Sequence, residues 1–458
     1  SHWCVERPPL RPGRDAMRWR APGLAIATVA LLVAACTVRP DAYDIDGQDI
    51  EVVFFHTGDI HSRLIPYELD VGETDEALGL LQQNAPFGGI ARLSALVRQE
   101  RRDNQRFAYV ETGDGFQGAP IFNVFEGEAE FKALTAMGLD AFAIGNHEFD
   151  NGAEHFVRMA QNHANFPMLA VNYLLEDPTV VGGASTGEIA QPYTILNLKG
   201  LRVGIIGLGN LSSMRSVFKG GNSQGITPLN TVEILQSYID FLRPQVDLLV
   251  SIGHIGYHDD LEYIPRVEGI DIVFGGHLHI ALDPPTVLQD CDVARLRREL
   301  DRYDCRTPEK LRQVQRACER KCDNDYPDAP AEAEACRLGC PEEAQDRCTQ
   351  EEESFRYAER RAELNHDIAR LEKRGCHPRD VILVHSGAFL KYAGRLQVTV
   401  RQCTRLEQAD VCMEFDEAGQ CLARRPRRCV GRSGGRNDWE VLAHRYNLIP
   451  IDRRLPDD

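Results

Sequence analysis

The chain is short of basic residues relative to acidic ones, with 52 Lys and Arg against 69 Asp and Glu in 458 residues and a formal net charge of −17. Because a nucleic-acid backbone is bound through basic patches, this balance disfavours a nucleic-acid duplex as a partner. It leaves room for a small phosphorylated substrate, since a bound metal ion can reverse the local field. The sequence also lacks an internal repeat and any apolar run near the ~20 residues of a membrane-spanning helix.

The longest apolar run, GLAIATVALLVAAC, follows Arg18 and Arg20 and ends at Cys36. A basic stretch, a short apolar stretch and small residues before a cleavage point are typical of a secretory signal. Residues 1–36 are therefore predicted to be a leader region, with Met17 as the true start of translation. The LVAAC ending resembles the cleavage site of bacterial lipoproteins, which makes Cys36 the expected lipidation site. We therefore expect an exported, periplasmic lipoprotein held to the membrane by its lipid anchor. An uncleaved anchor helix is the alternative.

Cysteine is absent between Cys36 and Cys291, and 12 of the 14 cysteines lie at or beyond Cys291. An even number in an exported chain predicts disulfides. The segments CERKC (318–322) and CRLGC (336–340) each place two cysteines on one helix face. They predict an antiparallel helical hairpin with the pairs Cys318–Cys340 and Cys322–Cys336. Zinc held by four thiolates is the alternative.

From Glu51 onward, short apolar runs alternate with helical patterns, which predicts an α/β architecture with largely parallel strands buried on both faces. The expected strands begin at VVFF (52–55), FAYV (107–110), AFAI (141–144), LRVGIIGL (201–208), DLLVSI (247–252) and DIVFGG (271–276). After Asp283 the composition becomes charged and cysteine-rich. We predict a main domain over 41–285 plus 379–458, interrupted by a cysteine-rich helical insert over 286–378. A basic run, ARRPRR (423–428), is predicted to be a hairpin loop.

Metal-ligand residue types follow five of these strands. They are Asp59, His61, Asp114, Asn146, His147, Asp150, His254, His277 and His279. Ligands in α/β sheets gather outside the carboxyl ends of strands, so these loops are expected to converge. Imidazole with carboxylate suits Mn, Zn or Fe, and so many groups fit two divalent ions rather than one. His277 and His279, two residues apart, would point opposite ways in an extended segment and serve one ion each.

The segments FFHTGDIHSRL, FGGIARL, IGNHEFDNG, FPMLAVNY, GGHLH and GAFLKYAGRL, in this order, resemble the calcineurin-like metallophosphoesterase superfamily and its bacterial 5′-nucleotidase branch. The likeness covers roughly 51–285 and 381–452. It implies a layered sandwich of two mixed β-sheets flanked by helices, with the insert as an addition. It also implies hydrolysis of a phosphomonoester, with a nucleotide as one candidate, by a metal-activated hydroxide.

By motif, the resemblance assigns Asp59, His61 and His279 to one metal ion. It assigns Asn146, His254 and His277 to the other, with Asp114 bridging. His147 would assist at the phosphoryl group and its leaving oxygen, and Asp150 would orient His147. Glu148 has no assigned role, and a buried structural hydrogen bond is expected for it.

Other readings stay open. The same metal pair hydrolyses phosphodiesters or cyclic nucleotides, and a non-catalytic envelope scaffold whose insert binds a protein partner is a third reading. The chain ends where the branch would begin a C-terminal nucleotide-recognition domain, so none is expected here. The insert is expected either to roof the metal site and select the substrate or to be an exposed decoration. Arg92 is expected at the surface, His258 in an exposed loop and His385 in the core.

Overall fold

The computed structural model describes residue 45 and residues 48–457, except for 69, 81–85, 176–189, 212–225, 304–307, 328, 353–354, 403–409, 416–420 and 427–438. The predicted leader and Cys36 lie outside the described residues. Within that part of the chain, no helix is both long and apolar enough to cross a membrane.

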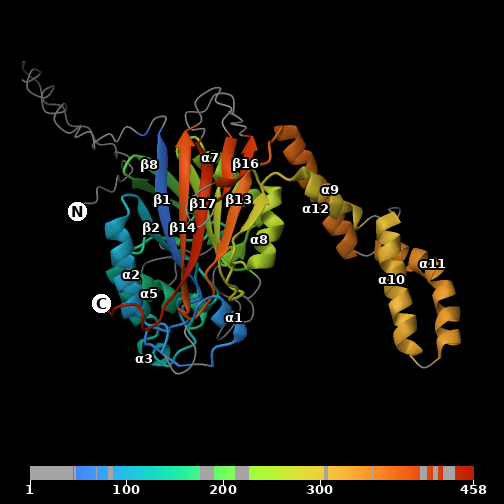
Figure 1. Cartoon of the computed structure of the whole chain (residues 1–458), viewed down its shortest axis with the longest axis horizontal. Coiled ribbons are helices and arrows are strands. Elements are labelled where there is room, and N and C mark those ends of the chain that lie inside the picture. Colours follow the sequence, from blue (N-terminus) through green and yellow to red (C-terminus); the bar gives the residue numbers. More distant parts are fainter. Residues whose placement is uncertain are drawn as a thin grey trace, which may run out of the picture. The chain divides into compact units, whose positions relative to one another are not determined.

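Two mixed β-sheets form the centre of the molecule (Figure 1). The first has the strand order β17 (Trp439–Pro450), β14 (Tyr392–Gln402), β1 (Asp49–Thr57), β2 (Phe107–Glu111), β3 (Ala141–Ala143), β4 (Met168–Leu169) and β6 (Ala190–Gln191). The second has the order β12 (Thr286–Gln289), β13 (Asp380–His385), β11 (Ile272–Gly275), β10 (Leu248–Gly253), β8 (Leu201–Leu208) and β7 (Tyr193–Leu198). Strands β1, β2, β3, β4 and β6 run parallel, as do β8, β10, β11 and β13. Antiparallel strands complete both sheets.

Alternation along β1 shows how the strands build several layers. Val53 and Phe55 enter the core under the helices, while Val52 and Phe54 enter the core between the sheets. Successive side chains of a strand point to opposite faces, so a continuous apolar run fits a strand covered on both sides. The run VVFF is therefore the sequence of a strand inside a sandwich.

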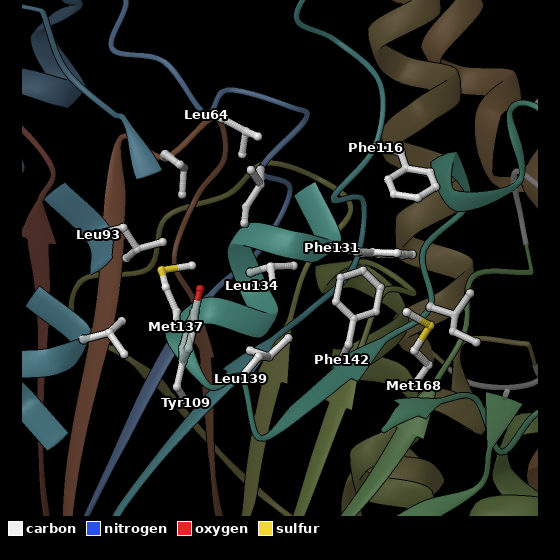
Figure 2. Packing of buried hydrophobic residues seen from close by; sticks show 14 of the residues in the cluster. Leu64, Leu93, Tyr109, Phe116, Phe131, Leu134, Met137, Leu139, Phe142 and Met168 are labelled. Carbon is white, nitrogen blue, oxygen red and sulfur yellow. The ribbon is translucent and has the colours of Figure 1, made fainter. Parts of the chain in front are cut away.

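Helices cover the outer face of each sheet. Those on the first sheet are α2 (Ile90–Asp103), α4 (Glu128–Met137) and α5 (Ala153–His163); those on the second are α7 (Thr231–Leu242) and α8 (Tyr257–Tyr263), which runs into the 3₁₀ turn η2 (Ile264–Arg266). Figure 2 shows the first of these cores, where Phe131 and Leu134 of α4 meet Phe142 of β3. The spacing of three between Phe131 and Leu134 places both on one helix face. Short elements complete this domain: α1 (Glu73–Ala77), α3 (Phe122–Phe125), the 3₁₀ turn η1 (His147–Phe149) and the strand pair β5 (Tyr173–Leu175) and β9 (Ile226–Pro228).

The predicted α/β class, the two mixed sheets and the expected strands are confirmed. The segment 381–400, which the resemblance includes, is divided between β13 in the second sheet and β14 in the first, with a turn at 386–391. The basic run 423–428 was wrongly expected to be a loop. Its first residues lie in β16 (Cys421–Pro426), which pairs with β15 (Asp410–Phe415).

The cysteine-rich segment folds into four helices, α9 (Val293–Asp301), α10 (Pro308–Asp325), α11 (Pro330–Glu352) and α12 (Phe355–Arg374). The predicted pairs Cys318–Cys340 and Cys322–Cys336 are confirmed as disulfides joining α10 to α11. Their sulfurs lie at bonding distance within each pair, which favours disulfides over the zinc alternative. A further disulfide, Cys291–Cys376, closes the base of the segment across 85 residues of sequence. The side chains of the four cysteines from Cys403 to Cys429 lie outside the described residues.

The base of the helical segment lies at the amino ends of the parallel strands. Strand β12 runs antiparallel to β13, so that Thr286 faces Leu383 and Gln289 faces Asp380. Along β12 the chain therefore runs from the carboxyl end of β11 back to the amino ends of the parallel strands, and α9 begins there. Residues 286–289, predicted as part of the insert, belong to the second sheet.

Candidate metal centre and active site

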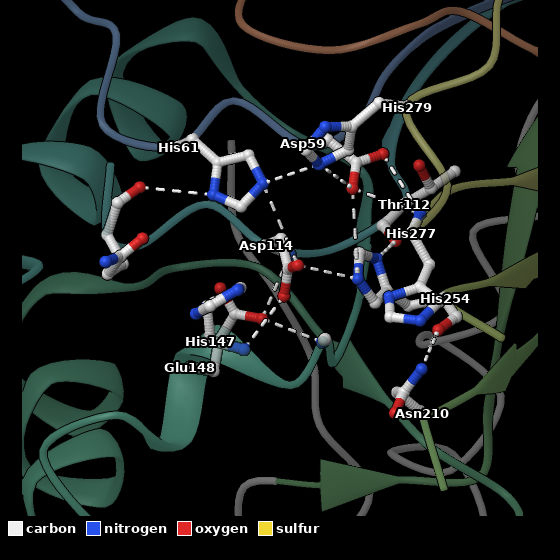
Figure 3. Close-up of polar contacts among 12 residues, drawn as sticks. Asp59, His61, Thr112, Asp114, His147, Glu148, Asn210, His254, His277 and His279 are labelled. Atoms are coloured by element: carbon white, nitrogen blue, oxygen red, sulfur yellow. Dashed lines mark hydrogen bonds and ion pairs between the residues drawn. The ribbon is translucent and has the colours of Figure 1, made fainter. Parts of the chain in front are cut away.

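The predicted ligand residues lie in loops at the carboxyl ends of five parallel strands, and the structure brings them together (Figure 3). Among the residues of this site, three groups have ligand atoms that all lie within 4.8 Å of one another. They are Asp59, His61 and His279; His61, Asp114 and His147; and Asp114, His254 and His277. The first group consists of the three residues predicted for one ion. The third contains His254 and His277, predicted for the other ion, together with Asp114, which also occurs in the second group. The assignment of these residues to two ions stays a prediction.

The loop backbone is strained at these positions. Asp59, His61, Asp114, His277 and His279 all have positive φ angles, between 50° and 81°. Residues with a Cβ seldom adopt this conformation, and such residues cluster at functional sites. His277 and His279 do fall in different groups, but the expected reason was wrong: both have positive φ angles beside a bend and do not lie in an extended segment.

His254 is fully buried, and hydrogen bonds on the side away from Asp114 fix its orientation. Its Nδ1 donates to the Thr112 carbonyl oxygen at 2.7 Å, and the Asn210 amide donates to the His254 carbonyl at 3.0 Å. Its Nε2 lies 2.8 Å from Asp114 Oδ2; burial disfavours the charged ring, but this carboxylate raises the pKa of His254 to about 10. A histidine that donates its other ring nitrogen to a carbonyl is typical of metal ligands.

His61 repeats this arrangement in the other group. Its Nδ1 lies 3.2 Å from the Gln117 carbonyl oxygen, and its Nε2 lies 2.9 Å from His279 Nε2. The backbone N–H of His277 donates to both carboxylate oxygens of Asp59, at 3.0 and 3.1 Å. These contacts hold the side chains in place and leave ring nitrogens directed at one another.

The donor set fits divalent cations on its own chemistry. Asn146 Oδ1 is buried without a hydrogen-bond partner in the described part of the chain. Burial and the neighbouring Asp114 raise the pKa of Asp59 to about 7, against the attraction of His254. Burial lowers the pKa of His61 and of His277 to about 4, so both rings are neutral near pH 7. Buried carboxylates, neutral imidazoles and an amide oxygen without partners are what a cation would satisfy.

Glu148 connects two of the ligand loops. Its fully buried carboxylate accepts the backbone N–H groups of Asp114, Gly115 and Phe116 at 3.1, 2.8 and 3.3 Å, and that of Gly145 at 2.7 Å. A Cβ on Gly145 would lie 2.3 Å from Asp114 Oδ1, so only glycine lets the loops approach this closely. The buried structural hydrogen bond expected for Glu148 is confirmed. It positions Asp114 and Gly145, the residue that precedes Asn146.

His147 and Asp150 form the expected pair, with Nδ1 and Oδ2 2.9 Å apart. Burial disfavours protonation of His147, but the bond to Asp150 and the charge of Asp114 raise its pKa overall. The backbone N–H of His147 donates to Asp114 Oδ1 at 2.9 Å. His147 is therefore held beside Asp114, with its ring fixed by Asp150.

The smaller predictions have mixed outcomes. His385 lies in the core as expected, and its Nε2 is 2.9 Å from Asp260 Oδ2. His258 is exposed as expected, but in α8 and not in a loop. Arg92 was wrongly expected at the surface. It is 7% exposed, because its guanidinium reaches the Pro86 and Gly88 carbonyl oxygens and Asp457.

A family model described as calcineurin-like phosphoesterase matches residues 52–281, which include the whole set of predicted ligands. The chain belongs to the calcineurin-like phosphoesterase family. Bovine (Bos taurus) 5′-nucleotidase is 31% identical over 240 residues, which is 52% of this chain and 40% of the bovine protein. This phosphoesterase thus matches less than half the length of that relative. The bacterial branch stays a prediction.

Solved structures share the fold. A 5′-nucleotidase precursor from Thermus thermophilus superposes with a TM-score of 0.54 at 21% identity, covering 89% of this chain and 56% of that one. A sulfate thiohydrolase from the same genus superposes with a TM-score of 0.51 at 13% identity, covering 89% and 58%. Because proteins with different activities share this architecture, the reaction of this phosphoesterase has to be argued from its site.

Proposed function

We propose that this phosphoesterase is a phosphomonoesterase of 5′-nucleotidase type that uses two divalent metal ions. The observation that supports two ions most directly is the separation of the ligand atoms into the group Asp59, His61 and His279 and the group Asp114, His254 and His277. A single ion would leave one of these groups as buried, uncompensated polar atoms, which is costly. Mn, Zn and Fe all suit imidazole and carboxylate ligands.

In this proposal Asn146 joins His254 and His277, because its buried oxygen has no other partner among the described residues. Asp114 lies between the two groups, since it contacts His254 and also approaches His61 at 3.9 Å. Bound divalent ions would supply Lewis acidity toward the phosphoryl oxygens and a lowered pKa of water.

His147 is the proposed catalytic residue that does not depend on metal ligation. Its Nδ1 is held by Asp150, so Nε2 is the atom available to the substrate. A protonated Nε2 donates a hydrogen bond to the phosphoryl group and to the departing oxygen, and Asp150 stabilises that protonated ring. Asp150 is a positioning residue, because it acts through His147.

A nucleotide is the proposed substrate class. The support is the similarity to proteins named 5′-nucleotidase, the bovine protein among them, over the part of the chain that holds the site. Export is proposed as well, because disulfides such as Cys318–Cys340 persist in oxidising compartments. Lipidation of Cys36 remains part of this proposal, and replacing Cys36 by Ser should abolish incorporation of labelled fatty acid.

The experiment measures phosphate release by the full chain, with its disulfides intact, after metal removal and addition of Mn²⁺. The substrates are AMP, p-nitrophenyl phosphate and bis(p-nitrophenyl) phosphate. We expect AMP to be cleaved with the highest kcat/KM and about two Mn²⁺ per chain to be bound. Preferential cleavage of the diester would contradict the monoesterase, and metal binding without cleavage of any ester would favour a scaffold.

His147→Ala tests the mechanism, with His258→Ala as the matched control because His258 is exposed on α8. Loss of a positioned acid is expected to lower kcat by roughly 10²- to 10⁴-fold. The Mn²⁺ content of His147→Ala should equal that of the control. Full activity in His147→Ala would overturn the assigned role.

A further inference from the structure

The turn at 386–391, between β13 and β14, connects the two loops that carry one of the proposed ligand groups. The backbone N–H of Phe389 donates to the Asp59 carbonyl oxygen at 2.8 Å, and that of Gly387 donates to the Ile280 carbonyl oxygen at 2.9 Å. Asp59 belongs to the ligand loop after β1, and Ile280 directly follows the ligand loop after β11. The turn therefore holds together two loops that are distant in the sequence.

His279 lacks the orienting hydrogen bond that His254 and His61 have. Its Nε2 lies 2.9 Å from His61 Nε2 and 3.5 Å from Asp59 Oδ1, on the side of the other ligands. Its Nδ1 has no hydrogen-bond partner within the described residues, and 39% of the side chain is exposed. Metal-binding histidines usually donate this second ring nitrogen to a carbonyl or a carboxylate. The His279 ring therefore depends on packing for its orientation.

The Phe389 ring supplies this packing. Its centroid lies 4.8 Å from that of His279, with the ring planes at 75°. It also lies 5.3 Å from the centroid of the His61 ring, with the planes at 40°. Edge-to-face contacts between aromatic rings are favourable and directional. One half-buried side chain thus contacts both histidines of this ligand group.

Phe389 has a backbone conformation that a bulky residue seldom adopts. Its φ is +63°, and that of the next residue, Leu390, is +52°. Such strain persists where surrounding contacts impose it, and here the Tyr67 hydroxyl donates to the Phe389 carbonyl oxygen at 2.7 Å. Glycine would adopt this conformation without strain. The local backbone therefore does not explain a phenylalanine at this position, whereas its ring contacts do.

We propose that Phe389 is a positioning residue for the ion assigned to Asp59, His61 and His279. Its ring holds His279 against His61 in the orientation needed for ligation and so raises the affinity of the chain for that ion. The proposal rests on the proposed function, in which this group holds one of two ions. It deepens that function, because it makes one ion depend on a side chain that is not a ligand.

The other ligand group has support of its own. His254 Nδ1 donates to the Thr112 carbonyl oxygen, and the His277 ring packs against the His254 ring with the centroids 5.1 Å apart. Within the described residues, no aromatic contact joins Phe389 to either of these rings. Loss of the Phe389 ring is therefore expected to affect one ion and not the other.

The test measures equilibrium binding of Mn²⁺ to the full chain after metal removal, by electron paramagnetic resonance. Phe389→Gly removes the ring and also relieves the positive φ, while Phe389→Tyr keeps a ring. Lys199→Gly is the matched control, because Lys199 has a φ of +50° and is exposed in the turn before β8. We expect Phe389→Gly to bind one Mn²⁺ about tenfold more weakly and the other within about twofold of the native affinity. Phe389→Tyr and Lys199→Gly should keep both native affinities, and native affinity for both ions in Phe389→Gly overturns the proposal.

Thermal unfolding distinguishes a positioning role from a merely structural one. Positioning predicts a smaller rise in melting temperature on addition of Mn²⁺ to Phe389→Gly than to the native chain, since weaker binding stabilises less. A lower melting temperature of the metal-free variant with an unchanged rise would instead assign Phe389 to the fold. Phe389→Leu, which keeps an apolar side chain, replaces Phe389→Gly if the latter does not fold. Native Mn²⁺ affinity in Phe389→Leu would then contradict the proposal.

A double-mutant cycle shows whether Phe389 acts through His279. His279→Ala removes the ring that Phe389 is proposed to hold, so adding Phe389→Gly to it should weaken Mn²⁺ binding no further than about twofold. A further loss of about tenfold in the His279→Ala background would show that Phe389 acts in another way and contradicts the proposal.

Failure of this proposal and failure of the proposed function give different results. Hydrolysis of AMP by the native chain, with unchanged Mn²⁺ binding in Phe389→Gly, contradicts the role of Phe389 alone. Two bound Mn²⁺ without hydrolysis of any ester contradict the proposed phosphomonoesterase, and selective weakening of one ion in Phe389→Gly would still support the positioning role. Binding of a single Mn²⁺ by the native chain contradicts both.

Discussion

Buried carboxylates have different partners at the two ends of the β-sandwich. At the carboxyl ends of the strands, Asp59, Asp114 and Glu148 contact histidines and backbone N–H groups, and among the described residues none of the three is paired with arginine or lysine. At the amino ends, buried carboxylates face guanidinium groups. Asp271 lies 2.7 Å from Arg243.

The same difference extends to the helical segment. Its last helix, α12, is attached through Arg266 to Asp367 at 2.7 Å and through Arg374 to Asp240 at 2.6 Å. A buried carboxylate with a guanidinium partner is already neutralised and serves the fold. Asp59 has no such partner, and burial raises its pKa to about 7, so its charged form destabilises the metal-free fold above that pH. The comparison indicates that one end is built for a metal and the other for structural attachment.

The largest effect is expected for Asp59→Asn. The substitution removes a proposed ligand charge and should lower kcat by more than about 10³-fold and reduce the Mn²⁺ content. Because it also removes an uncompensated buried charge, the metal-free variant should melt at a higher temperature than the metal-free native protein at pH 8. Calorimetry and metal analysis check both results. A lower melting temperature for the metal-free variant than for the metal-free native protein would contradict the difference between the two ends.

Asp271→Asn is the matched substitution at the other end. Here the carboxylate is paired with Arg243 and Arg379, so its loss should lower the free energy of unfolding by about 3–5 kcal/mol. The activity of the folded fraction should stay at the native value. Urea unfolding with and without Mn²⁺ measures the first effect, and a loss of kcat comparable to that of Asp59→Asn would argue against the division between the two ends.

Removal of the Cys291–Cys376 disulfide should have a smaller effect. The double substitution to serine releases a closed loop of 85 residues and is expected to cost about 2–4 kcal/mol of stability. Because the base of the helical segment lies at the amino ends of the strands, kcat/KM for AMP should not change by more than about twofold. A large loss of kcat/KM with the stability maintained would show that the segment acts on the site.

The smallest effect concerns pH. His56 is fully buried against Tyr446, and burial lowers its pKa from 6.5 to about 3. The unfolded chain takes up a proton below pH 6.5 and the folded chain does not, so stability is lost as the pH falls toward 3. Between pH 7 and 5 the loss is about 2 kcal/mol. His56→Phe should remove that part of the pH dependence in urea unfolding curves, and an unchanged slope would contradict it.

Local patterns predicted much of this molecule. Continuous apolar runs predicted β1, β2 and β10, and the helical patterns between such runs predicted the alternation of strands with helices, because these elements depend on which side chains must leave water. The pairing Cys318–Cys340 followed from spacing along two helices. The edge strands β7 and β12 were not predicted, since their alternating, half-exposed sequences have no continuous apolar signal.

The sequence by itself determined which residues can bind metal ions and that they follow strands, because residue type and strand order are local properties. Only the tertiary structure decided how they are grouped. The approach of His61 to His279 and the four N–H groups held by Glu148 depend on loops far apart in the chain. Such contacts form only when the sheets are packed, and no spacing along the sequence encodes them.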